Sequence, residues 1–129
     1  MFDILENYFT KTRIKQYVDN GTIEISPLAY MRGRTFNNCF IIADEMQNST
    51  HQQMKMVLTR LGEGSQLAIT GDPDQCDLPE PELCGLSELI LKLEGYSNQL
   101  EYIEHIILSD EDIQRHPAVQ EVCDVYRTY

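Results

Sequence analysis

The sequence predicts an α/β domain with a mostly parallel sheet flanked by helices. Two short apolar runs, residues 39–43 and 67–69, have the length and composition of buried strands. Between them, apolar residues recur at the spacing of a single helical face: Met54, Val57, Leu58 and Leu61. A strand, a helix and a second strand in this order form a unit whose two strands run parallel.

Size and composition suit one soluble domain over residues 1–129, with room for a hydrophobic core. No apolar run is long enough to cross a bilayer, and the start of the chain lacks the basic residues of a signal peptide. We therefore expect a cytoplasmic protein that does not use a membrane. The four cysteines form no CxxC pair, so neither a metal site nor a disulfide framework is predicted.

The net charge of −11 argues against a dedicated nucleic-acid-binding protein, because such a chain repels phosphate. Basic residues gather in only two places, at residues 11–15 and at Arg32 and Arg34. The charge leaves open a contact of one face with nucleic acid in a larger assembly.

Before the first apolar run, residues 2–19 have helical spacing, with a break predicted near residues 10–12. Residues 22–26 alternate as a short strand would, and Pro27 ends them. Residues 27–38 are predicted to be a loop with one helical turn. The strand at residues 39–43 is expected to be buried on both faces.

After this strand, Ser49 or Thr50 can cap the helix, with Gln52 or Gln53 in capping-box register. Beyond the second strand, the order is predicted to be an exposed loop, a helix that Gly95 ends, a strand and a last helix. These elements correspond to residues 76–84, 86–93, 102–108 and the segment that begins at Pro117.

Asp44 and Glu45 follow the first strand directly and should emerge at the carboxyl edge of the sheet, where open α/β sheets bind ligands. Asp44 would then hold Mg²⁺ and Glu45 would orient or activate a water, which is the layout of a Walker B segment. The alternative is an acidic turn between a strand and a helix.

Gly71, Asp72 and Gln75 follow the second strand and should reach the same edge. Phosphoryl transfer needs a metal ligand, a positioned water and a polar group near the γ-phosphate, and Gln75 is the candidate for the third role. Alone, this segment could be a turn in which Asp72 bonds its own backbone. Together with the carboxylate pair, it favours a site.

The segment PLAYMRGRTFNNCFIIADEMQNSTHQQMKMVLTRLGEGSQLAITGDPDQCDLP, residues 27–79, resembles the PhoH-like family, P-loop ATPases similar to superfamily 1 helicases. The resemblance implies ATP and Mg²⁺ as ligands, Asp44 and Glu45 as the Walker B pair, and Gly71, Asp72 and Gln75 as a helicase-like GDxxQ motif. It also implies that Arg115, in an RHP segment, reaches a phosphate. The ordinary alternative for Arg115 is an ion pair with a neighbouring carboxylate.

The family pattern GxxxxGK followed by Ser or Thr has no match, because residues 1–129 contain no Gly-Lys pair. We therefore expect a partial P-loop fold, its C-terminal part, without the first strand and the phosphate loop. Two hypotheses follow. In one, the chain supplies the Walker B and sensor residues of an ATPase, completed by a separately encoded Walker A chain, by residues outside the range 1–129 or within a homo-oligomer. In the other, it is a non-catalytic remnant that serves as a binding module.

Overall fold

A computed structural model describes residues 2–80, 83–96, 100–109, 112 and 116–127. The fold divides into two units, Met1–Leu91 and Lys92–Tyr129, and each is described by itself. The single domain over the whole chain stays a prediction.

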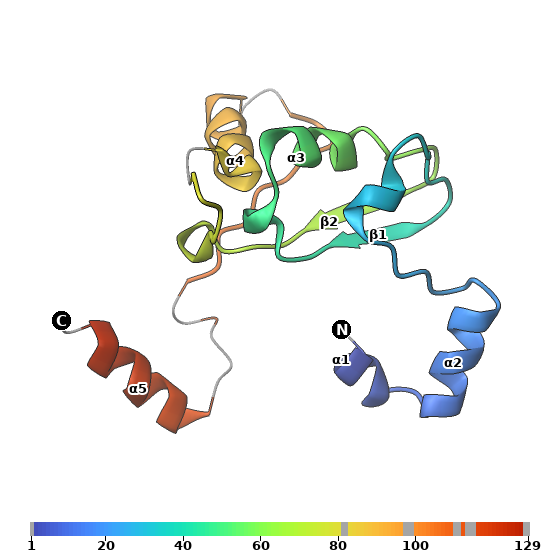
Figure 1. The fold of residues 1–129 in the computed structure, drawn as a ribbon, viewed down its shortest axis with the longest axis horizontal. Coiled ribbons are helices and arrows are strands. Elements are labelled where there is room, and N and C mark those ends of the chain that lie inside the picture. The colour runs from blue at the N-terminus through green and yellow to red at the C-terminus, as the bar shows by residue number, and fades with distance from the viewer. Residues whose placement is uncertain (1, 81–82, 97–99, 110–111, 113–115, 128–129) are drawn as a thin grey trace. The chain divides into compact units, whose positions relative to one another are not determined.

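The first unit contains most of the regular structure (Figure 1). Its elements in chain order are α1 (Phe2–Glu6), α2 (Lys11–Asp19), the 3₁₀ turn η1 (Leu28–Met31), β1 (Phe40–Ala43), η2 (Met46–Asn48), α3 (His51–Leu58), β2 (Gln66–Ile69), η3 (Pro73–Gln75) and the first part of α4 (Gly85–Tyr96). The second unit holds the end of α4, an irregular extended segment and α5 (Pro117–Arg127). The structure is thus a small α/β protein.

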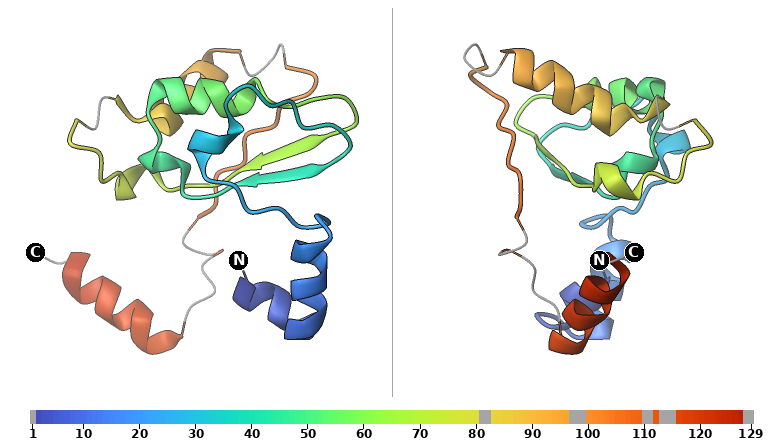
Figure 2. Two further views of the ribbon diagram at one scale, coloured as in Figure 1. Left: turned by 45° about the vertical axis from the view of Figure 1, so that its right-hand side comes forward. Right: turned by 90° about the vertical axis from the view of Figure 1, so that its left-hand side faces the viewer.

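The sheet confirms the predicted parallel pairing. Phe40 lies opposite Gln66 and Ala43 opposite Ile69, and α3 connects the two strands while covering one face (Figure 2). Backbone hydrogen bonds continue past the last pair, because Thr70 N–H donates to the Ala43 carbonyl at 2.9 Å and Met46 N–H donates to the Thr70 carbonyl at 3.0 Å. The carboxyl ends of both strands are therefore tied together.

The hydrophobic core lies on the face of the sheet that the helices cover. Its buried members come from η1, the end of β1, η2, α3, the residue before α4 and the start of α4: Met31, Ala43, Met46, Met54, Val57, Cys84 and Leu86. On the other face, Phe40 is 63% exposed and Ile42 is 47% exposed. The expectation of a strand buried on both faces is therefore wrong for this structure, because the described elements cover only one side of β1.

Local capping signals are confirmed where they were predicted. The Gln53 N–H donates to Thr50 Oγ1 at 3.3 Å, and Gln53 Oε1 accepts from the Thr50 N–H at 2.8 Å, which completes a capping box at the start of α3. The N-terminal helical stretch breaks as expected, and Thr10 caps α2 by accepting from the Arg13 N–H. Pro117 is the first residue of α5, as predicted.

Two predicted strands are wrong. Residues 22–26 and 102–108 form no strand, although their composition is typical of one. A strand needs a neighbour to satisfy its backbone, and neither segment has one among the described residues. Tyr102 is 91% exposed and Ile107 is 76% exposed, so the described residues of the second unit leave much of this apolar run uncovered. In the described part of the chain, no helix combines the length and apolar character that crossing a membrane requires.

Candidate functional site

The carboxyl edge of the sheet brings together the polar residues that follow the two strands. Asp44 comes directly after β1, and Thr70 comes directly after β2. The Thr70 hydroxyl donates to Asp44 Oδ1 at 2.5 Å, which fixes one carboxylate oxygen. Asp44 itself is exposed, and its Oδ2 atom has no hydrogen bond to any described residue.

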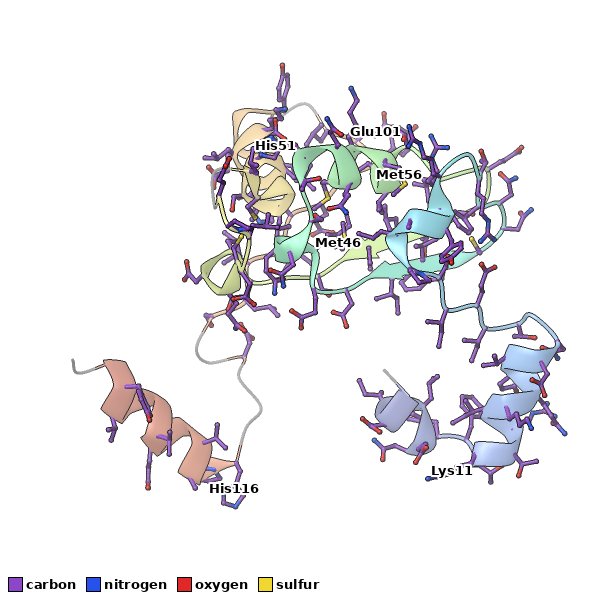
Figure 3. The ribbon with its side chains drawn as sticks, in the orientation of Figure 1. Lys11, Met46, His51, Met56, Glu101 and His116 are labelled. Carbon is purple, nitrogen blue, oxygen red and sulfur yellow. The ribbon has the colours of Figure 1, made fainter. Side chains whose placement is uncertain are left out.

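Glu45 changes the direction of the chain after β1. Its φ of 56° and ψ of 38° are in the left-handed region, which is uncommon for a residue with a side chain. The bend starts η2 and places Met46 in the core, where it is 2% exposed (Figure 3). Burial of Met46 and the hydrogen bonds of this turn hold Glu45 in that conformation, while its own side chain is exposed.

Gln47 joins the two strand ends. Its side chain is buried, at 2% exposure. The Nε2 atom donates to Glu45 Oε2 at 2.6 Å, and Oε1 accepts from the Asp72 N–H at 3.3 Å. Sequence reasoning missed this residue. The only signal was an amide two positions after the carboxylate pair, and nothing in its neighbours predicts that it turns inward.

Asp72 organises the turn after β2. Its Oδ1 accepts from the Asp74 N–H at 3.0 Å and its Oδ2 accepts from Gln75 Nε2 at 2.7 Å. Asp72 therefore bonds its own backbone two residues on, as in the turn hypothesis, and it also orients Gln75 at the edge. A chain of hydrogen bonds runs from Glu45 through Gln47 and Asp72 to Gln75, so these residues lie at one edge of the sheet.

The close approach of the Gln47 and Leu86 side chains to the backbone explains why residue 71 is a glycine. A Cβ atom at this position would lie 2.7 Å from Gln47 Oε1 and 2.7 Å from Leu86 Cδ2. Any side chain would therefore push Gln47 away from the amide it accepts from. A contact of Gly71 with a cofactor stays a prediction.

The exposed Asp44 carboxylate fits the way in which Mg²⁺ is commonly bound together with phosphates and waters. Among the described residues, no three His, Cys, Asp or Glu side chains converge as a metal-binding cluster. Magnesium is commonly held by one or two carboxylates together with substrate phosphates and waters, and does not need a cage of protein ligands. An exposed Asp44 with one oxygen bonded to Thr70 suits that mode.

The candidate cations give a mixed result. Arg115 lies outside the described residues, while the neighbouring His116 accepts from the Ala118 N–H through Nδ1 at the start of α5 (Figure 3). Arg34 makes two hydrogen bonds to the Glu24 carboxylate, the second at 2.9 Å. Its guanidinium carbon, Cζ, lies over the Phe36 ring, 4.5 Å from the ring centre. These bonds from Arg34 hold the pKa of Glu24 below its usual value.

The fold and the edge define a class: an α/β protein with parallel strands and polar residues at their carboxyl ends, compatible with a P-loop nucleotide triphosphatase fold. The sequence profile described as PhoH-like protein matches residues 1–127. The chain therefore belongs to the PhoH-like family.

Named relatives agree with this family. The chain is 43% identical over 128 residues to a PhoH-like protein of Synechocystis, with 98% of this chain and 37% of the relative covered. It is 42% identical over 126 residues to a PhoH-like protein of Bacillus subtilis, covering 98% of this chain and 38% of the relative. Protein PhoH of Escherichia coli is 43% identical over 106 residues, which are 82% of this chain and 29% of that protein. The chain thus spans well under half the length of these relatives.

Proposed function

We propose that the chain supplies the Walker B and sensor edge of a Mg²⁺–ATP site. Asp44 would hold Mg²⁺, which when bound neutralises phosphate charge. Glu45 would orient and activate the attacking water, and Gln75 would contact the γ-phosphate. Gly71 and Asp72 would lie against the nucleotide, and Arg115 would reach a phosphate.

The observation that carries the proposal is the hydrogen-bonded edge. Thr70 holds Asp44, and Gln47 connects Glu45 to the turn that carries Gln75. Pre-positioned polar groups of this kind are what phosphoryl transfer requires, because the protein acts mainly by positioning and electrostatics. The proposed role of Glu45 is compatible with these contacts. Only its Oε2 is bonded to Gln47, and its side chain is exposed, so Oε1 is accessible to a water.

The phosphate-binding loop would come from residues outside 1–129. Such a loop consists of consecutive N–H groups on a glycine-rich turn with a lysine, and residues 1–129 contain no Gly-Lys pair. We propose that the site is completed by a Walker A segment that lies outside residues 1–129, on the same polypeptide or on a separate chain, or within a homo-oligomer. By itself, the chain would bind ATP weakly and hydrolyse it very slowly or not at all.

The second candidate function is a non-catalytic binding module. The exposure of Phe40 and Ile42 on the outer face of β1 supports it, because an uncovered parallel sheet offers a surface to a partner. The two functions differ in whether Glu45 matters for chemistry.

Titration calorimetry with Mg²⁺–ATP and a phosphate-release assay separate them. The chain is measured alone and with a polypeptide that carries a strand followed by a GxxxxGK-Thr loop. For the ATPase edge, turnover appears with that polypeptide, and Glu45→Gln lowers it by at least about 100-fold. Glu63→Gln is the matched control, because Glu63 is exposed and does not belong to the edge. Equal turnover in Glu45→Gln and the control would overturn the catalytic proposal. Micromolar binding by the chain alone, with turnover that Glu45→Gln abolishes, would exclude the remnant.

A further inference from the structure

The two carboxylates after β1 each have one oxygen bonded to a neighbouring side chain and one oxygen without a hydrogen bond. Thr70 donates to Asp44 Oδ1 at 2.5 Å, and Gln47 donates to Glu45 Oε2 at 2.6 Å. No described residue is hydrogen-bonded to Asp44 Oδ2 or to Glu45 Oε1. Both side chains are exposed, so each presents a single unbonded oxygen to a ligand.

Asp72, the carboxylate in the turn after β2, is bonded differently. Its Oδ1 accepts from the Asp74 N–H at 3.0 Å and its Oδ2 accepts from Gln75 Nε2 at 2.7 Å, so both oxygens are used within its own turn. Of these three carboxylates, only Asp44 and Glu45 therefore keep an unbonded oxygen for a cation or a water.

The backbone of Thr70 is fixed on both sides of the residues that it serves. Its N–H donates to the Ala43 carbonyl at 2.9 Å, and its carbonyl accepts from the Met46 N–H at 3.0 Å. These two partners directly precede Asp44 and directly follow Glu45 in the chain. Because threonine is branched at Cβ, its side chain also has few rotamers. The hydroxyl is therefore held where it can keep its bond to Asp44 when a ligand binds.

We propose that Thr70 is a positioning residue that limits Asp44 to one metal-binding oxygen and so makes the edge prefer Mg²⁺ to Ca²⁺. The inference rests on the proposed function, because it takes Asp44 as the metal ligand. It goes further by assigning the choice of ion to a side chain that acts through Asp44.

The two ions need different things from a carboxylate. Mg²⁺ requires near-ideal octahedral geometry and is held by one or two carboxylates together with phosphates and waters. Ca²⁺ accepts about six to eight oxygens in a flexible arrangement and can take both oxygens of one carboxylate. A two-oxygen contact at Asp44 would weaken the bond from Thr70 to Oδ1, whereas a one-oxygen contact through Oδ2 keeps that bond. The bond therefore costs Ca²⁺ more than it costs Mg²⁺.

The same bond orients the Asp44 carboxylate for Mg²⁺. Removing a hydrogen-bond partner of a metal ligand commonly lowers metal affinity by about 10- to 100-fold. Loss of the Thr70 hydroxyl is therefore expected to weaken Mg²⁺ binding. Binding of Ca²⁺ should not fall in parallel, because Oδ1 then becomes available to this ion.

The test is a titration of the whole ¹⁵N-labelled chain with MgCl₂ and, separately, with CaCl₂ at constant ionic strength, followed through the amide resonances of residues 43–46 and 70–72. Residue-resolved shifts separate binding at the edge from ions that associate with other surface carboxylates, and Asp44→Asn shows which shifts depend on Asp44. The wild-type chain should bind Mg²⁺ more tightly than Ca²⁺. In Thr70→Val, the ratio of Mg²⁺ affinity to Ca²⁺ affinity should fall by at least about tenfold.

Thr70→Ser is the matched control, because it keeps the hydroxyl and should keep most of the preference for Mg²⁺. Thr70→Ala is a second variant without the hydroxyl and should behave like Thr70→Val, and the amide spectrum of each variant shows whether it is folded. A ratio that stays at the wild-type value in valine and alanine, or that falls equally in serine and valine, would overturn the inference and leave Asp44 as the metal ligand. If the wild-type chain shows no shift that depends on Asp44, the metal role proposed for Asp44 fails, and the inference fails with it.

Discussion

The two turns at the carboxyl edge of the sheet are built differently. In the turn after β1, Met46 and Gln47 are each only 2% exposed, so the chain enters the core immediately after its carboxylate pair. In the turn after β2, residues 70–75 are all exposed, and Asp72 holds them with hydrogen bonds to Asp74 and Gln75. The first turn is anchored by packing, and the second is anchored by local polar contacts and by Gln47.

This difference assigns separate tasks to two residues of the same type. Gln47 is buried and holds the turns together, whereas Gln75 is exposed and its side chain is bonded only within its own turn, to Asp72. Replacing a buried amide with a smaller side chain is costly, because it leaves a cavity and removes the hydrogen bonds that the amide made. An exposed amide contributes little to stability, so it can be used for binding.

The largest expected effect tests this division directly. Gln47→Ala should lower the free energy of unfolding by about 3 kcal/mol, because it leaves a cavity and removes the partner of the Asp72 N–H. Gln75→Ala, the same change in the other turn, should lower it by less than about 0.5 kcal/mol. Urea denaturation of both variants measures the two values. Equal losses would show that the turns do not differ in the way described.

The next effect tests the close approach of the turns. Gly71→Ala should destabilise the protein by about 2 kcal/mol, because the added methyl group would overlap Gln47 and Leu86. Gly95→Ala is the matched control. Among the described residues, no atom apart from the backbone and chain neighbours of α4 itself lies within 4 Å of the place that a methyl group would occupy at this position, so alanine should stabilise the helix by about 0.5 kcal/mol. Thermal unfolding of the pair gives opposite signs if the packing argument is correct, and a neutral Gly71→Ala would contradict it.

A smaller effect concerns the one side-chain bond between Asp44 and the second turn. Thr70→Val removes the hydroxyl that donates to Asp44 and should cost about 1 kcal/mol, since a hydrogen bond to a charged group is involved at an exposed site. Thr70→Ser keeps the hydroxyl and should recover most of this loss. Denaturant titration distinguishes them. If serine and valine behaved alike, the loss would come from the Thr70 methyl group and not from its bond to Asp44.

The smallest effect lies away from the edge and serves as a reference for it. The Arg34 bonds lower the pKa of Glu24 in the folded protein, so the stabilisation is present above the unfolded-state pKa and is lost as pH falls through the lower folded-state value. Glu24→Gln should therefore flatten the decline in stability below about pH 4.5, the ordinary value for this group. Because both side chains are well exposed, salt should weaken the effect. Urea midpoints measured across acidic pH test it, and an unchanged decline would assign that decline to other carboxylates.

Local sequence rules predicted the elements whose signals are local. The capping box of Thr50 and Gln53, the break before α2, and the start of α5 at Pro117 all depend on neighbours within a few residues. Parallel pairing of the two strands followed from the strand–helix–strand order and needed no distant information. The position of the candidate site at the carboxyl edge follows from the same order.

The wrong predictions concern burial and partners at a distance. Residues 22–26 and 102–108 have strand composition, but no described segment pairs with them. Phe40 and Ile42 are apolar without being covered. An apolar residue in a sequence shows what it would gain by burial, and does not show which part of the chain is available to bury it.

The sequence by itself determined the family, the parallel βαβ unit and the carboxylates that follow its first strand, because spacing and chain order are sufficient for these. Only the tertiary structure decided that Gln47 turns inward to join the strand ends. This depends on the left-handed turn at Glu45 and on the packing of α4 against the core, because residues far apart in the chain fill the same buried space. Close packing in three dimensions decides which residues are buried there, and local sequence patterns do not contain that information.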